Sequence, residues 1–242
     1  MSRQRASRAA APVVDARTSS VTTARFTTAR FTTALLVCGV LAGPLFVTVI
    51  AAQALTRDGF DPSRHPISAL SLGDRGWIQI TDFVLVGALS VAFAVGLRRV
   101  LPPAAATWGP LLTAVYGAGL IVTGVFVGDP GLGFPPGTDP RIPELSWHAA
   151  VHAAAPPVAV GALIGVCAVF THRFLEGSRR GWAWCSAGTG VTALALLLWP
   201  GAGGTVRTAV AVLITSAWMT AIAIDATTEQ RRLRRSAAAI TG

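Results

Sequence analysis

Long apolar runs separated by short polar segments dominate the chain from residue 34 to residue 224. Each run is close to the length of helix that crosses the hydrocarbon core of a bilayer, about 20 residues. The pattern predicts six membrane-spanning helices, at residues 34–55, 77–97, 108–127, 147–170, 182–200 and 207–224. We therefore expect an all-α, polytopic transmembrane helical bundle with both termini on one side of the membrane.

The first apolar run has a competing interpretation as a signal peptide, because Ala52-Gln53-Ala54 has the small-residue spacing of a cleavage site. The run is longer than the usual apolar core of a signal peptide, about 7 to 15 residues, and further spans follow it. We therefore expect an uncleaved helix. Gly39 and Gly43 give it a small-residue face against which a neighbouring helix can pack closely.

Tryptophans mark the starts of four later runs, at Trp77, Trp108, Trp147 and Trp182. An indole ring favours the headgroup level of a bilayer, so these residues are expected to be interfacial anchors. Composition agrees with a membrane protein: 52% of residues are hydrophobic and 13% are charged, whereas soluble domains carry about 25% charged residues. With only three cysteines, all inside predicted spans, no disulfide framework is indicated.

All 20 basic residues are arginines, and they are distributed unevenly between the two sides of the predicted bundle. Fifteen fall on the side of the termini and five on the opposite side. The positive-inside rule then predicts cytoplasmic termini in a plasma or inner membrane. Because the arginines flank apolar runs, we expect them to contact membrane lipids and not nucleic acid. Neither a protein partner nor an oligomeric state is indicated.

Both ends of the chain are polar. Residues 1–33 are rich in Arg, Ser and Thr, and they predict a disordered cytoplasmic tail, with an organelle transit peptide as the alternative. Residues 225–242 predict a basic cytoplasmic tail.

Two longer segments, residues 56–76 and 128–146, are expected on the outer side. In the first, Pro66 to Gly73 predicts a short helix that lies in the interface, since Pro suits a first turn and Gly an end. The second is too rich in Pro and Gly for regular structure. Both contain Gly-Phe-x-Pro, which is either a trace of duplication or a chance match.

Polar residues inside the spans are the candidates for chemistry, because burying them in lipid costs free energy. Asp82 and His152 each lie five residues beyond a tryptophan that begins a span, so both are expected about 7.5 Å below the outer interface. They could meet if the second and fourth spans are neighbours.

Glu144, His148 and His152 recur every four residues and would share one helix face. Two imidazoles at this spacing are a workable pair of zinc ligands, with His65 or a carboxylate such as Asp82 or Glu144 completing the site. The metal would activate a water and a carboxylate would accept its proton, giving hydrolysis of an ester or amide. Two alternatives remain open: packing by hydrogen-bonded histidines, and a protonatable Asp–His pair for transport or pH sensing.

Several motifs together resemble a known family: Leu41 to Phe46, His65 to Gly73, Gly133 to Gly137, and Leu145 to His148 with His152. The resemblance is to domain-of-unknown-function family nine hundred and ninety-eight, six-span membrane proteins of bacteria and archaea that are common in actinobacteria. It implies the fold but no activity.

A looser likeness links the sequence to the membrane hydrolase superfamily of alkaline ceramidases and progestin-type receptors. That likeness implies a zinc site in which Ser68, Asp82, His65, His148 and His152 fill the functional roles, although the number of spans and the positions of the histidines differ. The sequence thus favours a membrane protein of structural, transport or lipid-interacting function. A zinc-dependent hydrolase acting on a lipid, amide or ester at the outer interface is the alternative.

Overall fold

The computed structural model describes residues 16–102, 106–141 and 145–241. It is all-α, and its six long helices each contain a stretch long and apolar enough to cross a membrane. They are α1 (Ala16–Thr56), α2 (Gly76–Val100), α3 (Trp108–Val125), α4 (Trp147–Glu176), α5 (Arg180–Leu198) and α6 (Gly204–Thr241). The predicted number and order of spans are confirmed, and α2 to α5 begin within two residues of the expected positions.

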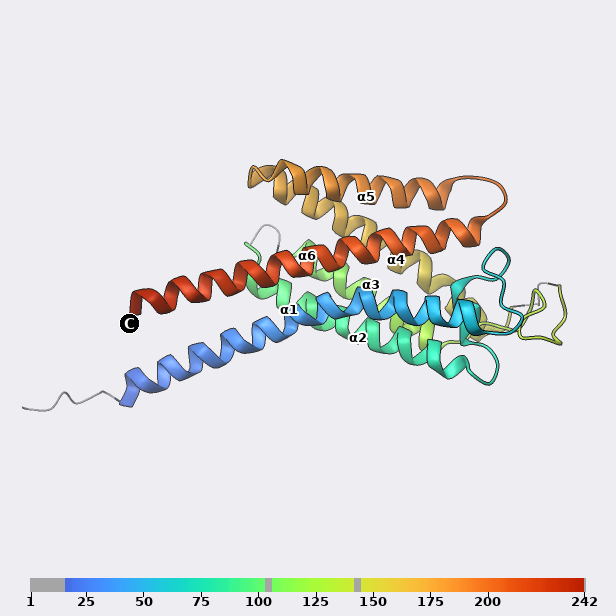
Figure 1. The fold of residues 1–242 in the computed structure, drawn as a ribbon, viewed down its shortest axis with the longest axis horizontal. Coiled ribbons are helices and arrows are strands. Elements are labelled where there is room, and N and C mark those ends of the chain that lie inside the picture. The colour runs from blue at the N-terminus through green and yellow to red at the C-terminus, as the bar shows by residue number, and fades with distance from the viewer. Residues whose placement is uncertain (1–15, 103–105, 142–144, 242) are drawn as a thin grey trace, which may run out of the picture.

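The helices form a closed ring in which each packs against the next along the chain and α6 packs against α1. Figure 1 shows the start of α1 and the end of α6 on one side of the bundle, together with the end of α2, the start of α3 and the α4–α5 connection. We call this side the terminal end, and the opposite side the loop end. The loop end carries the first loop (residues 57–75) and the second loop (residues 126–146).

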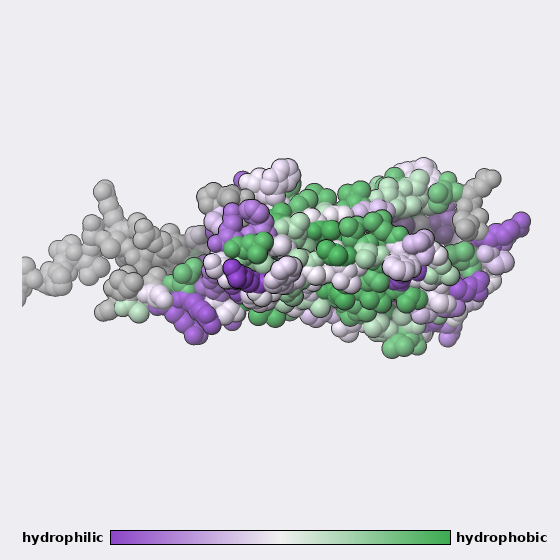
Figure 2. All heavy atoms as spheres, turned by 90° about the horizontal axis from the view of Figure 1, so that it is seen from above, coloured by the Kyte–Doolittle hydropathy of each residue, from purple (hydrophilic) through white to green (hydrophobic). Residues whose placement is uncertain are grey.

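On the face shown in Figure 2, apolar residues cover the middle of the bundle and polar residues gather toward both ends. At the loop end, the side chains of Trp77 and Trp147 are exposed at the first turns of α2 and α4. Trp108 is exposed at the start of α3, at the opposite end. These positions agree with tryptophans that anchor the helices at two membrane surfaces.

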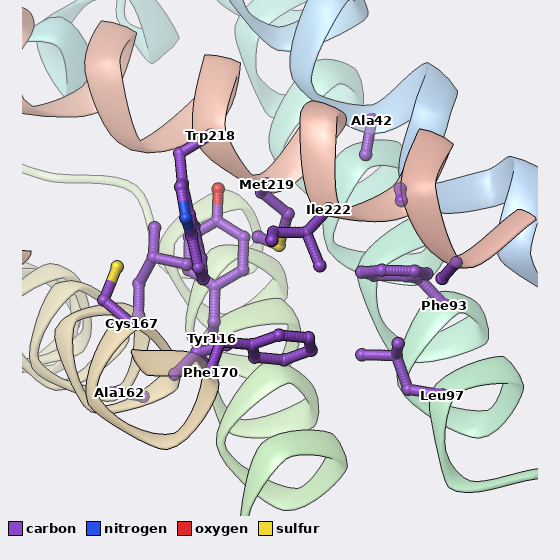
Figure 3. Close-up of a cluster of buried hydrophobic side chains, with 14 of the residues drawn as sticks. Ala42, Phe93, Leu97, Tyr116, Ala162, Cys167, Phe170, Trp218, Met219 and Ile222 are labelled. Atoms are coloured by element: carbon purple, nitrogen blue, oxygen red, sulfur yellow. The ribbon is translucent and has the colours of Figure 1, made fainter. Parts of the chain in front are cut away.

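The centre of the ring is filled by large side chains from several helices (Figure 3). Phe170 of α4 meets Trp218 of α6 edge to face, with ring centroids 5.9 Å apart. The indole N–H of Trp218 donates to the Ser186 hydroxyl of α5 at 3.1 Å, so its polar atom is satisfied although the ring is buried. Such packing and hydrogen bonding, and not hydrophobicity, hold helices together in lipid.

The glycine face of α1 packs as the sequence predicts. A Cβ at Gly43 would overlap the Thr220 hydroxyl and lie 2.7 Å from the Ser216 carbonyl oxygen, both on α6. A Cβ at Gly39 would lie 2.5 Å from the ring of Phe93 on α2. These two glycines therefore let α1 approach a helix on each side.

Residues 16–33 differ from the expectation of a disordered tail. The structure places them in α1, which begins at Ala16, whereas residues 1–15 lie outside the described residues. The segment has no Gly or Pro before Gly39, so the helix that spans the membrane can extend without interruption toward the N-terminus. At the other terminus, α6 likewise continues through the basic segment to Thr241.

The predicted short helix of the first loop is present as the 3-10 helix η1 (Ile67–Ser71). Pro66 precedes it, and Gly73 follows with a φ of 71°, a conformation that favours glycine. Leu70 and Ser71 are buried against the bundle, so η1 covers the loop-end surface of α1 and α2 and does not span.

Candidate functional site

A row of buried polar side chains connects α1 to α2 near the loop end. The Gln53 amide nitrogen on the last turns of α1 donates to the Gln79 amide oxygen at 2.7 Å. The Gln79 amide nitrogen in turn donates to Asp82 Oδ2 over a long 3.4 Å. All three side chains are buried, with exposed fractions of 5%, 0% and 3%. We call Gln53, Gln79 and Asp82 the amide–carboxyl chain.

The amide–carboxyl chain leaves oxygen atoms without partners. Asp82 Oδ1 and Gln53 Oε1 are buried and accept no hydrogen bond from the described residues. The Ser71 hydroxyl, at the end of η1, is a third such atom. Ser71 lies against the first turn of α2, because a Cβ at Gly76 would overlap the Ser71 carbonyl. Unpartnered buried oxygens are costly, and two of them belong to the amide–carboxyl chain itself.

Asp82 also lacks a countercharge. The ion pairs within the described part of the chain join other groups: Arg141 with Asp139, His172 with Glu176, and Arg179 with Asp225. A buried carboxylate without a cationic partner is normally neutralised by a proton or a bound cation. Packing alone therefore does not explain why the Asp82 carboxyl is buried.

His152 caps the end of α3. Its Nδ1 lies 2.6 Å from the Phe126 carbonyl oxygen and 3.1 Å from that of Thr123. Because both neighbours are acceptors, Nδ1 carries the proton, and in the neutral ring Nε2 holds the lone pair. A histidine that donates to the last carbonyls of a helix stabilises that terminus. For His152, the packing alternative therefore means that its ring caps the C-terminal end of α3 by hydrogen bonding.

Asp82 and His152 both lie near the end of α3, but α3 separates their helices. A Cβ at Gly124 of α3 would lie 3.0 Å from Phe83 Cβ, in the α2 turn that holds Asp82. The adjacent Thr123 supplies a carbonyl to His152. Among the described residues, no hydrogen bond or ion pair joins Asp82 to His152, because α3 packs between α2 and α4.

His65 lies in the first loop, where both of its ring nitrogens have partners. Nδ1 accepts from the backbone N–H of Asp61 at 2.9 Å, and Nε2 lies 3.1 Å from the Leu132 carbonyl oxygen of the second loop. The ring is buried beside Phe60 and Phe134. Ser68, a candidate nucleophile, lies partly buried in η1.

His148 occupies the first turn of α4, where Asp129 organises the helix start. Asp129 accepts from the backbone N–H of Ser146 at 2.7 Å and from its hydroxyl at 2.8 Å, which holds the pKa of Asp129 below its usual range. The Ser146 hydroxyl caps the helix by accepting from Ala149 N–H. The His148 ring lies against the rings of Trp147 and Phe126 in tilted contacts.

The predicted zinc ligands are not gathered in one place. No three His, Cys, Asp or Glu side chains of the described segments are positioned to hold a metal ion together. Glu144 lies outside the described residues, and His65 uses both nitrogens in hydrogen bonds. Zinc binding by His65, His148 and His152, with Asp82, Glu144 and Ser68 in catalytic roles, stays a prediction.

Three polar residues of this region were missed by sequence reasoning: Gln53, Gln79 and Ser71. That reasoning considered titratable side chains, and an amide or hydroxyl carries no charge that would mark it. A signal was available, because a glutamine inside an apolar run also costs free energy to bury unless it is hydrogen-bonded. Gln53 lies near the end of one span and Gln79 near the start of the next, and the two helices pack side by side.

Comparison with known proteins places the chain in a family. No significant match is found among curated proteins or among solved structures. Residues 40–225, which include all six helices in whole or in part, match the model of a family described as "Protein of unknown function (DUF998)". The chain therefore belongs to the DUF998 family of proteins of unknown function, as the motifs in its loops and spans predict.

Proposed function

We propose that this membrane protein is a proton-coupled transporter in which Asp82 takes up and releases the proton. The observation that carries the proposal is the Asp82 carboxyl, which is buried in a span with one oxygen unpartnered and, among the described residues, without an ion-pair partner. On insertion scales a charged aspartate at the centre of a span costs about 2.5 to 3.5 kcal/mol. Ionisable residues at such positions characteristically serve ion or proton pathways.

The amide–carboxyl chain supports the proposal because its hydrogen bonds all run in one direction, from donor to acceptor toward Asp82. Each amide nitrogen points toward the carboxyl, from Gln53 to Gln79 and from Gln79 to Asp82, so the charged form of Asp82 is stabilised by a donor. Gln53 Oε1 and the Ser71 hydroxyl add polar atoms toward the loop end. Such atoms can bind water molecules, which would connect Asp82 to the solution on that side.

The side on which Asp82 is reached follows from the arginine distribution. Fifteen of the 20 arginines belong to the terminal end and its connections, and the positive-inside rule assigns that end to the cytoplasm. The loop end then faces the outside of a plasma or inner membrane. Asp82 would exchange its proton with the external solution, while the basic terminal end contacts anionic lipids.

Proton flux into liposomes tests the proposal. Purified protein is reconstituted with an internal pH-sensitive dye, and a membrane potential with a negative interior is imposed. We expect wild-type vesicles to acidify faster than empty vesicles, and Asp82→Asn to reduce the rate at least about tenfold, because a neutral amide cannot carry the proton. Asp58→Asn, which changes an exposed loop carboxyl, is the matched control and should keep the wild-type rate.

Two results would contradict proton transport by Asp82. One is a wild-type rate equal to that of empty vesicles both without and with added solutes outside, and the other is an unchanged rate in Asp82→Asn. Because transport of an unknown solute can be obligatory for proton movement, the assay is repeated with a mixture of membrane-impermeant solutes outside. A flux that appears only with the mixture and depends on Asp82 supports the same proposal.

A zinc-dependent hydrolase is the second candidate, favoured by one observation at His152. Its Nδ1 is fixed by carbonyl acceptors, which is the arrangement that presents Nε2 of a histidine to a metal. Metal analysis of the purified protein separates the two candidates. Near-stoichiometric zinc that is lost in a His148→Ala/His152→Ala variant supports the hydrolase, and a wild type without zinc argues against it.

A further inference from the structure

The two loops at the loop end are closely interlocked. Phe60 of the first loop packs edge to face on Phe134 of the second, with ring centroids 5.5 Å apart. A Cβ at Gly59 would lie 2.7 Å from the ring of Pro136, so the backbone of the first loop at Gly59 lies against a side chain of the second loop. The two Gly-Phe-x-Pro motifs therefore meet, and both of their glycines have positive φ, 75° at Gly59 and 83° at Gly133.

His65 provides the side-chain hydrogen bond between these interlocked segments. Its Nδ1 accepts from Asp61 N–H within the first loop, and only an unprotonated nitrogen can do so. The proton of the neutral ring is therefore on Nε2, which donates to the Leu132 carbonyl of the second loop. The ring is 4% exposed and lies between Phe60 and Phe134, with centroid distances of 5.6 and 5.3 Å.

Protonation of His65 is incompatible with this arrangement. A second proton on Nδ1 would point at the N–H of Asp61, so two donors would face each other at 2.9 Å. The charged ring would also be buried between two phenylalanines, where it loses its hydration. The neutral ring fits the closed loops, and the charged ring requires that His65 leave its place.

The charged groups around His65 do not remove this conflict. The Arg57 guanidinium lies over the Phe134 ring, 5.4 Å from its centroid, and donates to the Leu70 and Leu72 carbonyls. Arg64 adjoins His65 in the chain, and the Asp61 carboxylate accepts from Ser63. In the second loop, Asp139 and Arg141 pair with each other, and Asp129 binds Ser146. From α6, the Thr205 hydroxyl contacts the Ser63 carbonyl.

We propose that His65 is a pH-sensitive joint that holds the first and second loops together when neutral and releases them when protonated. The geometry of the two loops alone supports the proposal of this joint. One consequence rests on the proposed function: η1 belongs to the first loop and packs on α1 and α2, the helices that carry the amide–carboxyl chain, so release of the joint would open the path from the external solution to Asp82 in acid.

Distance measurement between spin labels tests the joint. Labels are attached to Asp58→Cys and Pro140→Cys, both exposed, in full-length protein whose three native cysteines are replaced by alanine. Pulsed electron paramagnetic resonance then compares samples at pH about 8 and about 5, which bracket the titration of an ordinary imidazole. We expect one short distance at the higher pH and a longer distance as the major population at the lower pH.

Two variants decide whether His65 is responsible. His65→Gln can place an amide N–H near the Leu132 carbonyl but cannot gain a proton, so we expect the same distance distribution at both pH values. Asp61→Asn removes the neighbouring carboxylate as a source of the pH effect and should still open in acid. A wild type that does not change between the two pH values overturns the joint, and so does acid opening that persists unchanged in His65→Gln.

This experiment is independent of proton transport. Asp82→Asn should open in acid as the wild type does, because Asp82 makes no contact with the loop histidine among the described residues. Loss of proton flux in Asp82→Asn together with a pH-insensitive loop distance would refute the joint alone. An acid-opened loop in a protein without proton flux would refute the transport proposal alone.

Discussion

At the scale of single residues, Gln79 has the most connected position in the candidate site. Its amide accepts from Gln53 and donates to Asp82, and its side chain is fully buried. It thereby ties the end of α1 to the beginning of α2 and orients the carboxyl. A residue that satisfies two buried polar neighbours at once is expensive to remove, because both neighbours are left unpaired.

Substitution of Gln79 by methionine tests this role. Gln79→Met keeps the approximate volume, and we expect a loss of about 1 to 3 kcal/mol of stability, because the Gln53 and Asp82 atoms lose their partners. Thermal unfolding in detergent micelles measures the loss. Adding Gln53→Met to Gln79→Met should cost little more, since the partner is already absent, and strictly additive effects of the two substitutions would contradict the chain.

The residues of the candidate site were only partly predictable from the sequence. Asp82 stands out because a carboxyl in an apolar run is rare, and its depth could be read from its distance to Trp77. Contact with His152 could not be read in this way, because it depends on which helix lies beside α2, whereas Gln79 is three residues from Asp82 on the same helix. The spacing of His148 and His152 suggested a shared ligand role, yet their surroundings differ: His148 contacts aromatic rings at the start of α4, and His152 caps α3.

At the scale of helices and loops, several arginines of the loop end stabilise the structure around them. Arg57 donates to carbonyls that flank the end of η1, and Arg207 donates to carbonyls at the end of α5 and in the turn that follows, including those of Trp199 and Gly201. Arg141 is paired with Asp139. Cations near helix C-termini are stabilising, so these arginines have a reason to lie outside the basic terminal end.

At the terminal end, an arginine–aspartate pair joins the start of α5 to α6. Arg179 forms two hydrogen bonds with Asp225, at 2.8 and 2.6 Å, and these bonds raise the pKa of Arg179. Its guanidinium also lies 4.9 Å from the centroid of Phe174. The α4–α5 connection is thus fixed to α6 by a bidentate pair, the geometry in which arginine binds a carboxylate most specifically.

The close contact between α1 and α6 gives a prediction at this scale. Gly43→Ala would place a Cβ against Thr220 and the Ser216 carbonyl, so we expect a loss of about 1 to 3 kcal/mol from forced separation of the helices. Gly161→Ala is the control, because nothing lies within 4 Å of its Cβ and alanine favours a helix by about 0.5 to 1 kcal/mol. Thermal unfolding of both variants should shift in opposite directions, and equal shifts would contradict the packing.

At the scale of the whole molecule, the order of helices around the ring decides what the polar residues can do. The number, length and sequence of spans follow from apolar runs and tryptophans, since a helix must satisfy its own backbone in lipid. The order of the helices around the ring does not follow from the apolar runs. Small residues and a few hydrogen bonds determine which faces of two helices pack together in a membrane. With α3 between α2 and α4, the carboxyl of Asp82 faces amides and not histidine.

The extension of both terminal helices was also beyond the sequence pattern. Residues 16–33 have little apolar surface to bury, which is typical of disorder, but they continue a long helix that is already nucleated in the membrane. For the two loops, the sequence predicted the local structure but not the contact between them. Their Gly and Pro residues predicted irregular structure, and the contact of the two Gly-Phe-x-Pro motifs required the three-dimensional arrangement.

The central claim is that Asp82 carries an exchangeable proton inside the membrane, and labelling with a lipid-soluble carbodiimide tests it most directly. The reagent enters the bilayer and modifies protonated carboxyl groups, and mass spectrometry of peptides locates the adduct. We predict an adduct at Asp82 that decreases when the vesicles are made alkaline, with no labelling of that peptide in Asp82→Asn. An unmodified Asp82 at every pH, in protein whose exposed carboxyls do react in acid, would contradict the account.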